Sequence, residues 1–151
     1  MKKILAVLAI MAVICGACSQ SPMTAGDSFR TLPEEGWAYG DTIVFTFSPQ
    51  PADSAAKLAL AVRHAAGYQF ANLWLELSSG SGENRRIDTV NVRLADKYGR
   101  RLGRGIGVSY MKLDTLPGIY SLVCDSQIVV RHIMRLDTVV GIEQIGITHI
   151  D

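Results

Sequence analysis

The sequence is poor in the residues on which metal and redox sites depend. Its 151 residues include three cysteines and three histidines, and only 19% of the chain is charged. No two of the histidines (His64, His132 and His149) lie three to five residues apart, so the spacing typical of zinc ligands is absent. Fifteen basic against fourteen acidic residues leave a net charge of +1, without the basic excess of a nucleic-acid-binding protein. We therefore expect no metal, no cofactor and no nucleic-acid partner.

Motifs typical of catalysis are missing as well. The chain contains no Gly-x-Ser-x-Gly sequence to present a serine nucleophile, and its carboxylates are scattered singly. The glycine-rich stretch Gly103–Gly107 superficially resembles a phosphate-binding turn, but that site needs a helix N-terminus directly after the glycines, and no helix start follows here. Tight turns between strands are the favoured interpretation. The protein is not expected to be an enzyme.

The longest uncharged apolar run lies at the N-terminus and is typical of an export signal. Two lysines precede Ile4–Cys15, which is too short for a membrane-spanning helix of about 20 residues. The run leads into Cys-Gly-Ala-Cys at residues 15–18, which matches the bacterial lipobox, in which the last cysteine is diacylated and cleavage occurs directly before it. We predict a signal peptide over residues 1–17 and a lipid on Cys18, with plain secretion as the alternative.

Cleavage before Cys18 would leave Cys124 as the only free thiol of the mature chain. No intramolecular disulfide is then expected, although an oxidising compartment would allow one. Cys124 lies in the apolar run Ile119–Cys124, which predicts a strand. We expect Cys124 to be a small buried residue rather than a nucleophile.

Beyond the lipobox the chain divides into a tether and one domain. Residues 18–30 are mostly Ser, Gln, Pro, Thr, Gly and Asp, which predicts a flexible tether. Over residues 31–151 apolar and polar residues alternate, with turn signals about every ten residues, which predicts a single all-β domain, an antiparallel β-sandwich. The segments that carry this pattern or a strong apolar enrichment are Trp37–Phe47, Phe70–Leu77, Ile87–Leu94, Ile119–Cys124, Ile128–Arg135 and Ile142–Ile150.

Two further segments are less clear. In Ser54–Gly67 the alanines and a capping-type serine favour a helix, whereas the alternation of Leu58, Leu60 and Val62 with their neighbours favours a strand. Periodicity does not decide between them in so short a run. Tyr98–Gly107 contains four glycines and is expected to be a loop.

One tryptophan and three arginines are the candidate interaction residues. Trp74 is one of six aromatic residues that could form a ligand platform on a sandwich face, as in sugar-binding modules, although we favour a division in which half of the six fill the core. Arg100, Arg101 and Arg104 lie in the glycine-rich segment and could bind an anionic ligand, with a solvated loop as the default interpretation.

Three motifs occur in order along the mature chain. Residues 68–75 read Tyr-Gln-Phe-Ala-Asn-Leu-Trp-Leu, residues 94–107 contain Leu-Ala-Asp and then Leu-Gly-x-Gly-x-Gly, and Met134–Ile147 contains Met-Arg and then Gly-Ile-x-x-Ile-Gly. They resemble the aromatic Asn-Leu-Trp core, the glycine segment and the C-terminal motif of the gliding motility lipoprotein GldH family of Bacteroidetes. Trp37 and the lipobox also fall where that family has them.

The resemblance implies a non-enzymatic role in the cell envelope. The family is tied to gliding motility and to the secretion apparatus on which gliding cells depend, and it has no known enzymatic activity. Its segment before Asn-Leu-Trp is extended and carries an arginine, matched here by Arg63, which favours a strand over Leu58–His64. We expect an accessory lipoprotein that works with other envelope proteins of a gliding or secretion assembly. A glycan-binding β-sandwich lipoprotein is the alternative.

The residues that follow Cys18 predict where the anchored protein resides. A diacylated cysteine carries two chains, which suffice for stable attachment where one is marginal. Ser19 comes next, so the aspartate that retains lipoproteins in the inner membrane of proteobacteria is absent. An acidic run, which in Bacteroidetes often marks export to the cell surface, is also absent, because the next charge is Asp27. We expect an outer-membrane protein whose domain is on the periplasmic side.

Overall fold

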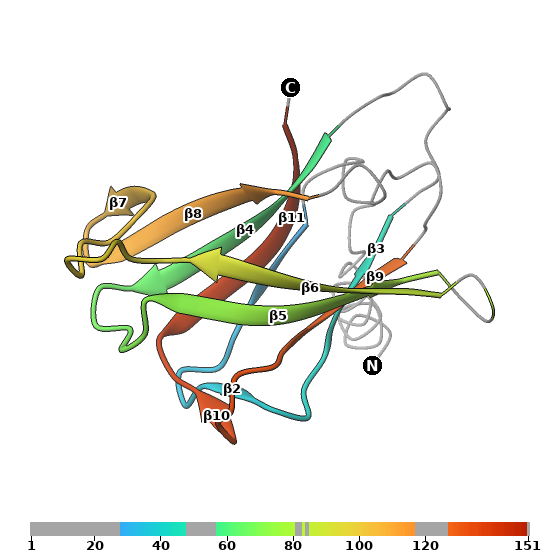
Figure 1. Ribbon diagram of the computed structural model, residues 1–151, viewed down its shortest axis with the longest axis horizontal. Helices are drawn as coiled ribbons and strands as arrows, with labels where there is room; N and C mark the ends of the chain where they lie inside the picture. Colours follow the sequence, from blue (N-terminus) through green and yellow to red (C-terminus); the bar gives the residue numbers. More distant parts are fainter. Residues whose placement is uncertain (1–27, 48–56, 81–82, 84, 117–126, 151) are drawn as a thin grey trace, which may run out of the picture.

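A computed structural model describes residues 28–47, 57–80, 83, 85–116 and 127–150. Within these ranges the chain forms strands and turns without any α-helix, and every strand pair is antiparallel. A five-stranded and a four-stranded sheet pack face to face (Figure 1), which confirms the predicted all-β sandwich. Cys18, Cys124 and the predicted strand Ile119–Cys124 lie outside the described residues.

The five-stranded sheet has the order β1-β11-β4-β8-β7. Its first strand pairs Ser28 with Ile147 and Arg30 with Ile145, so the sheet begins within the segment that composition assigned to the tether. The bounds are β1 Ser28–Thr31, β11 Ile142–Ile150, β4 Lys57–Ala65, β8 Ser109–Thr115 and β7 Arg104–Ile106.

The four-stranded sheet has the order β3-β9-β5-β6, and a two-stranded sheet joins β10 to β2. Strands β5, β6 and β9 lie where alternation predicted strands, within a few residues at each end. The bounds are β3 Ile43–Thr46, β9 Gln127–His132, β5 Asn72–Ser79, β6 Arg86–Arg93, β10 Thr138–Val139 and β2 Trp37–Ala38.

The predicted single strand Trp37–Phe47 is wrong, because the chain turns in its middle. The amide of Asp41 donates to the carbonyl of Ala38 over 3.0 Å, and the indole Nε1 of Trp37 donates to the carbonyl of Asp41 over 3.0 Å. This turn sends β2 and β3 into different sheets. Ile43 and Phe45 are buried in alternation along β3, and the buried Trp37 falls on the same parity, so the segment resembled one strand, although Tyr39 of that parity is exposed.

The ambiguous alanine-rich segment is strand β4, as the resemblance implied and against local helix propensity. Leu58, Leu60 and Val62 point into the core, and Ala59 and Ala61 lie on the outer face of the sheet. Both alanines are almost fully buried there, at 1% and 0% exposure, and beside Ala61 the ring of Phe29 crosses Gly146, where a Cβ would lie 2.3 Å from the Cδ1 atom of Phe29. Tertiary packing therefore decides the conformation of this segment.

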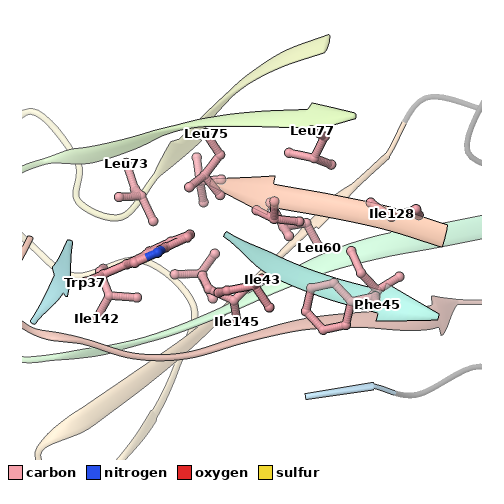
Figure 2. Packing of buried hydrophobic residues seen from close by; sticks show 14 of the residues in the cluster. Trp37, Ile43, Phe45, Leu60, Leu73, Leu75, Leu77, Ile128, Ile142 and Ile145 are labelled. Carbon is pink, nitrogen blue, oxygen red and sulfur yellow. The ribbon is translucent and has the colours of Figure 1, made fainter. Parts of the chain in front are cut away.

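The hydrophobic core lies between the two large sheets. Side chains of β5 on one side meet side chains of β4 and β11 on the other, and Trp37 fills the end near β2 (Figure 2). Fully buried members include Trp37, Phe45, Leu60, Tyr68, Leu73, Leu75, Leu77, Ile128, Ile145 and Ile147. Such side chains each contribute about 1.5–3 kcal/mol by leaving water.

The glycine-rich segment is only partly a loop, because β7 occupies Arg104–Ile106 and forms a hairpin with β8. A Cβ at Gly103 would lie 2.3 Å from the carbonyl oxygen of Met111, and its φ of +95° lies in the region that favours glycine. A Cβ at Gly105 would lie 3.2 Å from the ring of Tyr110. Two of the three glycines in the motif therefore allow close packing against β8.

Candidate interaction surfaces

Trp74 lies on the outer face of the four-stranded sheet. It alternates along β5 with the buried residues Leu73 and Leu75, so its indole points away from the core and is 41% exposed. Asn91 of β6 lies directly beside it in the sheet register. The backbone of Trp74 is also fixed from the other side, since its amide donates to the sulfur of Met134 over 3.4 Å.

A shallow cavity lies further along the same face. Glu76 of β5 accepts hydrogen bonds from Nε and Nη2 of Arg131 on β9, at 2.8 and 3.0 Å, in a bidentate ion pair. This pair raises the pKa of Arg131 above its ordinary value through the hydrogen bond and the charge of Glu76. The cavity has a volume of about 200 Å³ and is lined by Thr42, Glu76, Ser78, Arg85, Val129 and Arg131.

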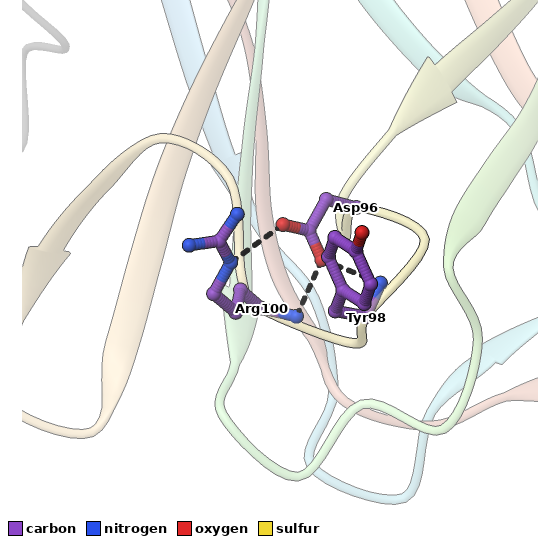
Figure 3. A network of polar contacts seen from close by, with 3 residues as sticks. All are labelled: Asp96, Tyr98 and Arg100. Atoms are coloured by element: carbon purple, nitrogen blue, oxygen red, sulfur yellow. Dashed lines mark hydrogen bonds and ion pairs between the residues drawn. The ribbon is translucent and has the colours of Figure 1, made fainter.

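Arg100 is engaged with Asp96 in a tight turn (Figure 3). Its Nε donates to Oδ2 of Asp96 over 2.7 Å, while the amides of Tyr98 and Arg100 donate to Oδ1 over 2.8 and 2.9 Å. Desolvation raises the pKa of Asp96, but the hydrogen bonds from Arg100 and Tyr98 outweigh it and hold the pKa below its ordinary value. The turn is an exposed structural unit with Tyr98 at its tip.

Arg101 points into the molecule and binds main-chain carbonyls. Its guanidinium donates to the carbonyls of Ala66 over 3.1 Å and Phe70 over 3.2 Å, and to the carbonyl of Tyr68 between them. It thus closes the connection between β4 and β5 onto the segment that follows β6. Sequence reasoning missed this role, because nothing local identifies carbonyls more than thirty residues away.

The four candidate residues therefore do not form one surface. Trp74 belongs to the four-stranded sheet and Arg104 to the exposed edge strand β7 of the other sheet. Arg100 and Arg101 are held by Asp96 and by backbone carbonyls, so the three arginines do not form a common patch for an anion. The six aromatic residues considered as a platform divide between core and surface. Trp37 and Tyr68 are buried, Phe70 is partly buried, and Tyr39, Trp74 and Tyr98 are exposed.

Two histidines are buried among aromatic rings. His64 stacks on Tyr110 with ring centres 5.7 Å apart, and His132 lies edge-on to Trp37 at 5.3 Å and to Tyr39 at 5.5 Å. Burial lowers the pKa of both histidines below the ordinary value of 6.5. Both histidines therefore pack in the fold as mainly uncharged side chains at neutral pH.

Neither a metal site nor a membrane helix is found in the described part of the chain. No group of three or more His, Cys, Asp or Glu side chains there could hold a metal ion. Among the same residues, no helix has the length and apolar character needed to cross a membrane.

Comparison with known families decides the identity. Residues 25–148 match the family model described as GldH lipoprotein, which spans the chain from before β1 into β11. The chain belongs to the GldH lipoprotein family. It is therefore a membrane-associated lipoprotein of a family associated with gliding motility, and that family is not known to contain enzymes. No curated protein and no solved structure matches the chain.

The three motifs of the GldH resemblance meet at one end of the sandwich. Arg101 of the glycine segment binds the carbonyl of Tyr68 in the aromatic motif. Gly141 of the C-terminal motif lies against the same tyrosine, where a Cβ would be 3.4 Å from its ring, and its carbonyl accepts from the amide of Ala65 over 2.8 Å. These motif residues hold the fold together, which leaves the outer faces of the two sheets for interactions.

Proposed function

We propose that this GldH-family protein is a non-enzymatic accessory component of a gliding motility or associated protein secretion assembly. Residues 1–17 act as the signal peptide, a diacylglyceryl group on Cys18 holds the protein in the outer membrane, and the following residues tether the β-sandwich on the periplasmic side. Its partners are other envelope proteins of the same assembly. The observation that carries this proposal is the family match over residues 25–148.

The outer face of the four-stranded sheet is the surface that suits a protein partner. It combines an exposed indole at Trp74, an exposed aliphatic side chain at Ile87 and the ion pair of Glu76 with Arg131. Protein interfaces are enriched in tryptophan and arginine around such apolar centres. By contrast, His132 packs against aromatic rings and Arg101 is bound to main-chain carbonyls, so neither is free for catalysis. This supports a role in binding.

Deletion of the gene tests the role in the assembly. We expect a changed set of secreted proteins, or loss of surface spreading in a gliding strain, with restoration by the wild-type gene. If both the secreted proteins and spreading stay unchanged, the proposed role in the machinery is wrong.

A photo-crosslinking residue in native membranes tests the surface. We expect a residue placed at Asn91, beside Trp74, to capture an envelope protein. The matched control is Val108, which is 78% exposed and lies in the turn between β7 and β8. Equal yields of the same adduct at both positions would argue against this face.

A glycan-binding lipoprotein is the second candidate, favoured by the exposed Trp74 on the same face as a cavity of about 200 Å³ with polar lining. Sugars stack on exposed aromatic faces and bind polar side chains beside them. Titration of tryptophan fluorescence with a panel of polysaccharides distinguishes this candidate, since a Trp74→Ala variant would lose any response. Absence of a response to every sugar would exclude it.

A further inference from the structure

The outer face of the five-stranded sheet carries an apolar row that crosses four strands. The sheet register aligns Phe29 of β1, Gly146 of β11, Ala61 of β4 and Leu113 of β8. Phe29 is 39% exposed and lies across Gly146, and Leu113 at the other end of the row is 48% exposed. Two large apolar side chains therefore stand on a floor of small residues, with their outer surfaces in contact with water.

Basic side chains flank this row on both sides. The neighbouring row contains Arg63 of β4 and Arg104 of β7 with Met111 of β8 between them. Beyond Ala59, Lys57 of β4 lies beside Ile150 at the other end of the sheet. Four rows of outward side chains cross the sheet at Lys57, Ala59, Ala61 and Arg63 of β4. Among the described residues, none of these rows contains an acidic side chain.

Among the described residues, the nearest carboxylate on this face lies at its end. Glu143 lies where the register shifts between Ile142 and Gln144, beyond the row of Arg63. Its carboxylate accepts a hydrogen bond from the hydroxyl of Ser109 over 2.8 Å. The apolar row and its three cations therefore form a continuous apolar and positively charged surface, which we call the β1–β8 face.

The chain length between the predicted anchor and β1 keeps this face close to the bilayer. Strand β1 starts at Ser28, ten residues after Cys18, and it forms one edge of the five-stranded sheet. Ten residues of chain span at most about 35 Å even when fully extended. Phe29 is the second residue of β1, so the β1–β8 face starts at the point where the domain is tied to the membrane.

We propose that the β1–β8 face docks on the anionic phospholipid surface of the membrane that holds the anchor. The inference rests on the lipid attachment at Cys18 proposed above. Membrane-surface binding strengthens with buried apolar area and with attraction of Lys and Arg to anionic headgroups, and this face supplies both. Docking by the β1–β8 face directs the opposite face, with Trp74 and the cavity beside Arg131, away from the bilayer toward protein partners.

Hydroxyl-radical footprinting of the intact lipoprotein tests this orientation. The acylated protein, purified in detergent, is reconstituted through its own anchor into vesicles of phosphatidylethanolamine with phosphatidylglycerol or into vesicles of phosphatidylcholine alone. On the anionic vesicles we expect severalfold lower oxidation of Phe29, Met111 and Leu113, and high salt should reverse the effect. Trp74 and Ile87, of comparable exposure on the other sheet, should be oxidised equally in both preparations.

A charge-reversal pair separates docking from simple proximity. Arg63→Glu with Arg104→Glu should remove the protection of Leu113 on anionic vesicles. The matched control, Arg85→Glu with Arg93→Glu, makes the same change of charge on the four-stranded side and should leave the protection intact. If the first pair does not fold, as judged by circular dichroism, Arg63→Gln with Arg104→Gln provides a milder test of the same expectation.

The outcomes distinguish this proposal from the anchor on which it rests. Protein that fails to float with vesicles shows that the lipid attachment is wrong. Protein that floats but is oxidised equally on both faces, or is protected at Trp74 instead, overturns the docking proposal and leaves the anchor standing. Protection that survives Arg63→Glu with Arg104→Glu overturns the electrostatic part and therefore the assignment to anionic lipid.

Discussion

The guanidinium of Arg101 donates a hydrogen bond to the backbone carbonyl of Tyr68, across a separation of 33 residues in sequence. The hydroxyl of Tyr68 in turn donates to the carbonyl of Asn72 over 3.0 Å, while its ring is buried against Phe70. Burial raises the pKa of the Tyr68 hydroxyl well above its ordinary value, so it remains a donor at any physiological pH. One arginine and one tyrosine thereby fix the connection between the two sheets.

Replacement of Arg101 by alanine should lower the free energy of unfolding by about 2 kcal/mol, because three carbonyls lose a charged donor. Chemical denaturation of the purified protein measures this. Arg104→Ala is the matched control, since Arg104 is exposed on β7, and should change the stability by less than about 0.5 kcal/mol. Equal effects of the two substitutions would show that Arg101 is not a clamp.

The Leu-Gly-x-Gly-x-Gly motif should tolerate alanine worst at Gly103. A methyl group there meets the carbonyl of Met111 and is forced to a φ of +95°. Strain and overpacking together should cost about 3 kcal/mol of unfolding free energy. Gly40→Ala is the control, with open space around it and no positive φ, and should be nearly neutral. A neutral Gly103→Ala in the same denaturation assay would contradict the close packing of β7 against β8.

Stability should decrease as the pH falls below about 6.5, the ordinary pKa of histidine in an unfolded chain. Burial lowers the pKa of His64 and His132 in the fold, so on acidification the unfolded state takes up protons before the folded state does. The contribution of the two histidines to the free energy of unfolding is therefore complete above about pH 6.5. It is lost as the pH falls from there toward their lowered pKa values in the folded state. Urea denaturation at about pH 7.5 and about pH 5 measures the difference.

Replacing both histidines by phenylalanine keeps aromatic rings in these positions and removes their titration. The double variant His64→Phe with His132→Phe should therefore show a flatter dependence of stability on pH in this range than the wild type. An unchanged slope would assign the acid sensitivity to other groups.

Much of the sandwich could be predicted from sequence because most strands bury one face only. Leu73, Leu75 and Leu77 occupy alternate positions of β5, and this pattern identified the strand directly. Strand β8 escaped the prediction. Its apolar side chains Met111 and Leu113 lie on the outer face, and Lys112 and Asp114 alternate with them on the inner face, which reverses the usual pattern. Trp37 and Ile43 share a parity across a turn that is formed by the hydrogen bonds of the Asp41 amide to Ala38 and of the Trp37 indole to Asp41.

The surfaces were less predictable than the fold. The exposure of Trp74 could be predicted, because it alternates along β5 with leucines that face the core. The pairing of Glu76 with Arg131 depends on which strands become neighbours, because the two residues are 55 positions apart in sequence. The β1–β8 face is likewise assembled from rows that cross four strands, so no single segment of sequence displays it.

Lipid attachment should depend on Cys18 alone. Cys18→Ala removes the thiol that forms the thioether, so the protein should lose incorporation of labelled palmitate and accumulate as the uncleaved precursor. Cys15→Ala is the matched control, because Val13 and Ile14 before Cys15 are too bulky for the lipobox, and it should keep labelling and maturation. Palmitate found in the Cys18→Ala protein would show that the anchor assignment is wrong.

The side of the outer membrane on which the domain lies can be measured directly. Asp27 is the first charged residue after Cys18, so the acidic run associated with surface export is missing and the domain should remain in the periplasm. Protease added to intact cells should therefore leave the protein whole, and permeabilisation of the outer membrane should expose it to the protease. Degradation in intact cells would place the domain outside. That result would reverse the facing and leave the lipid attachment at Cys18 unaffected, since the same two acyl chains hold the protein from either side.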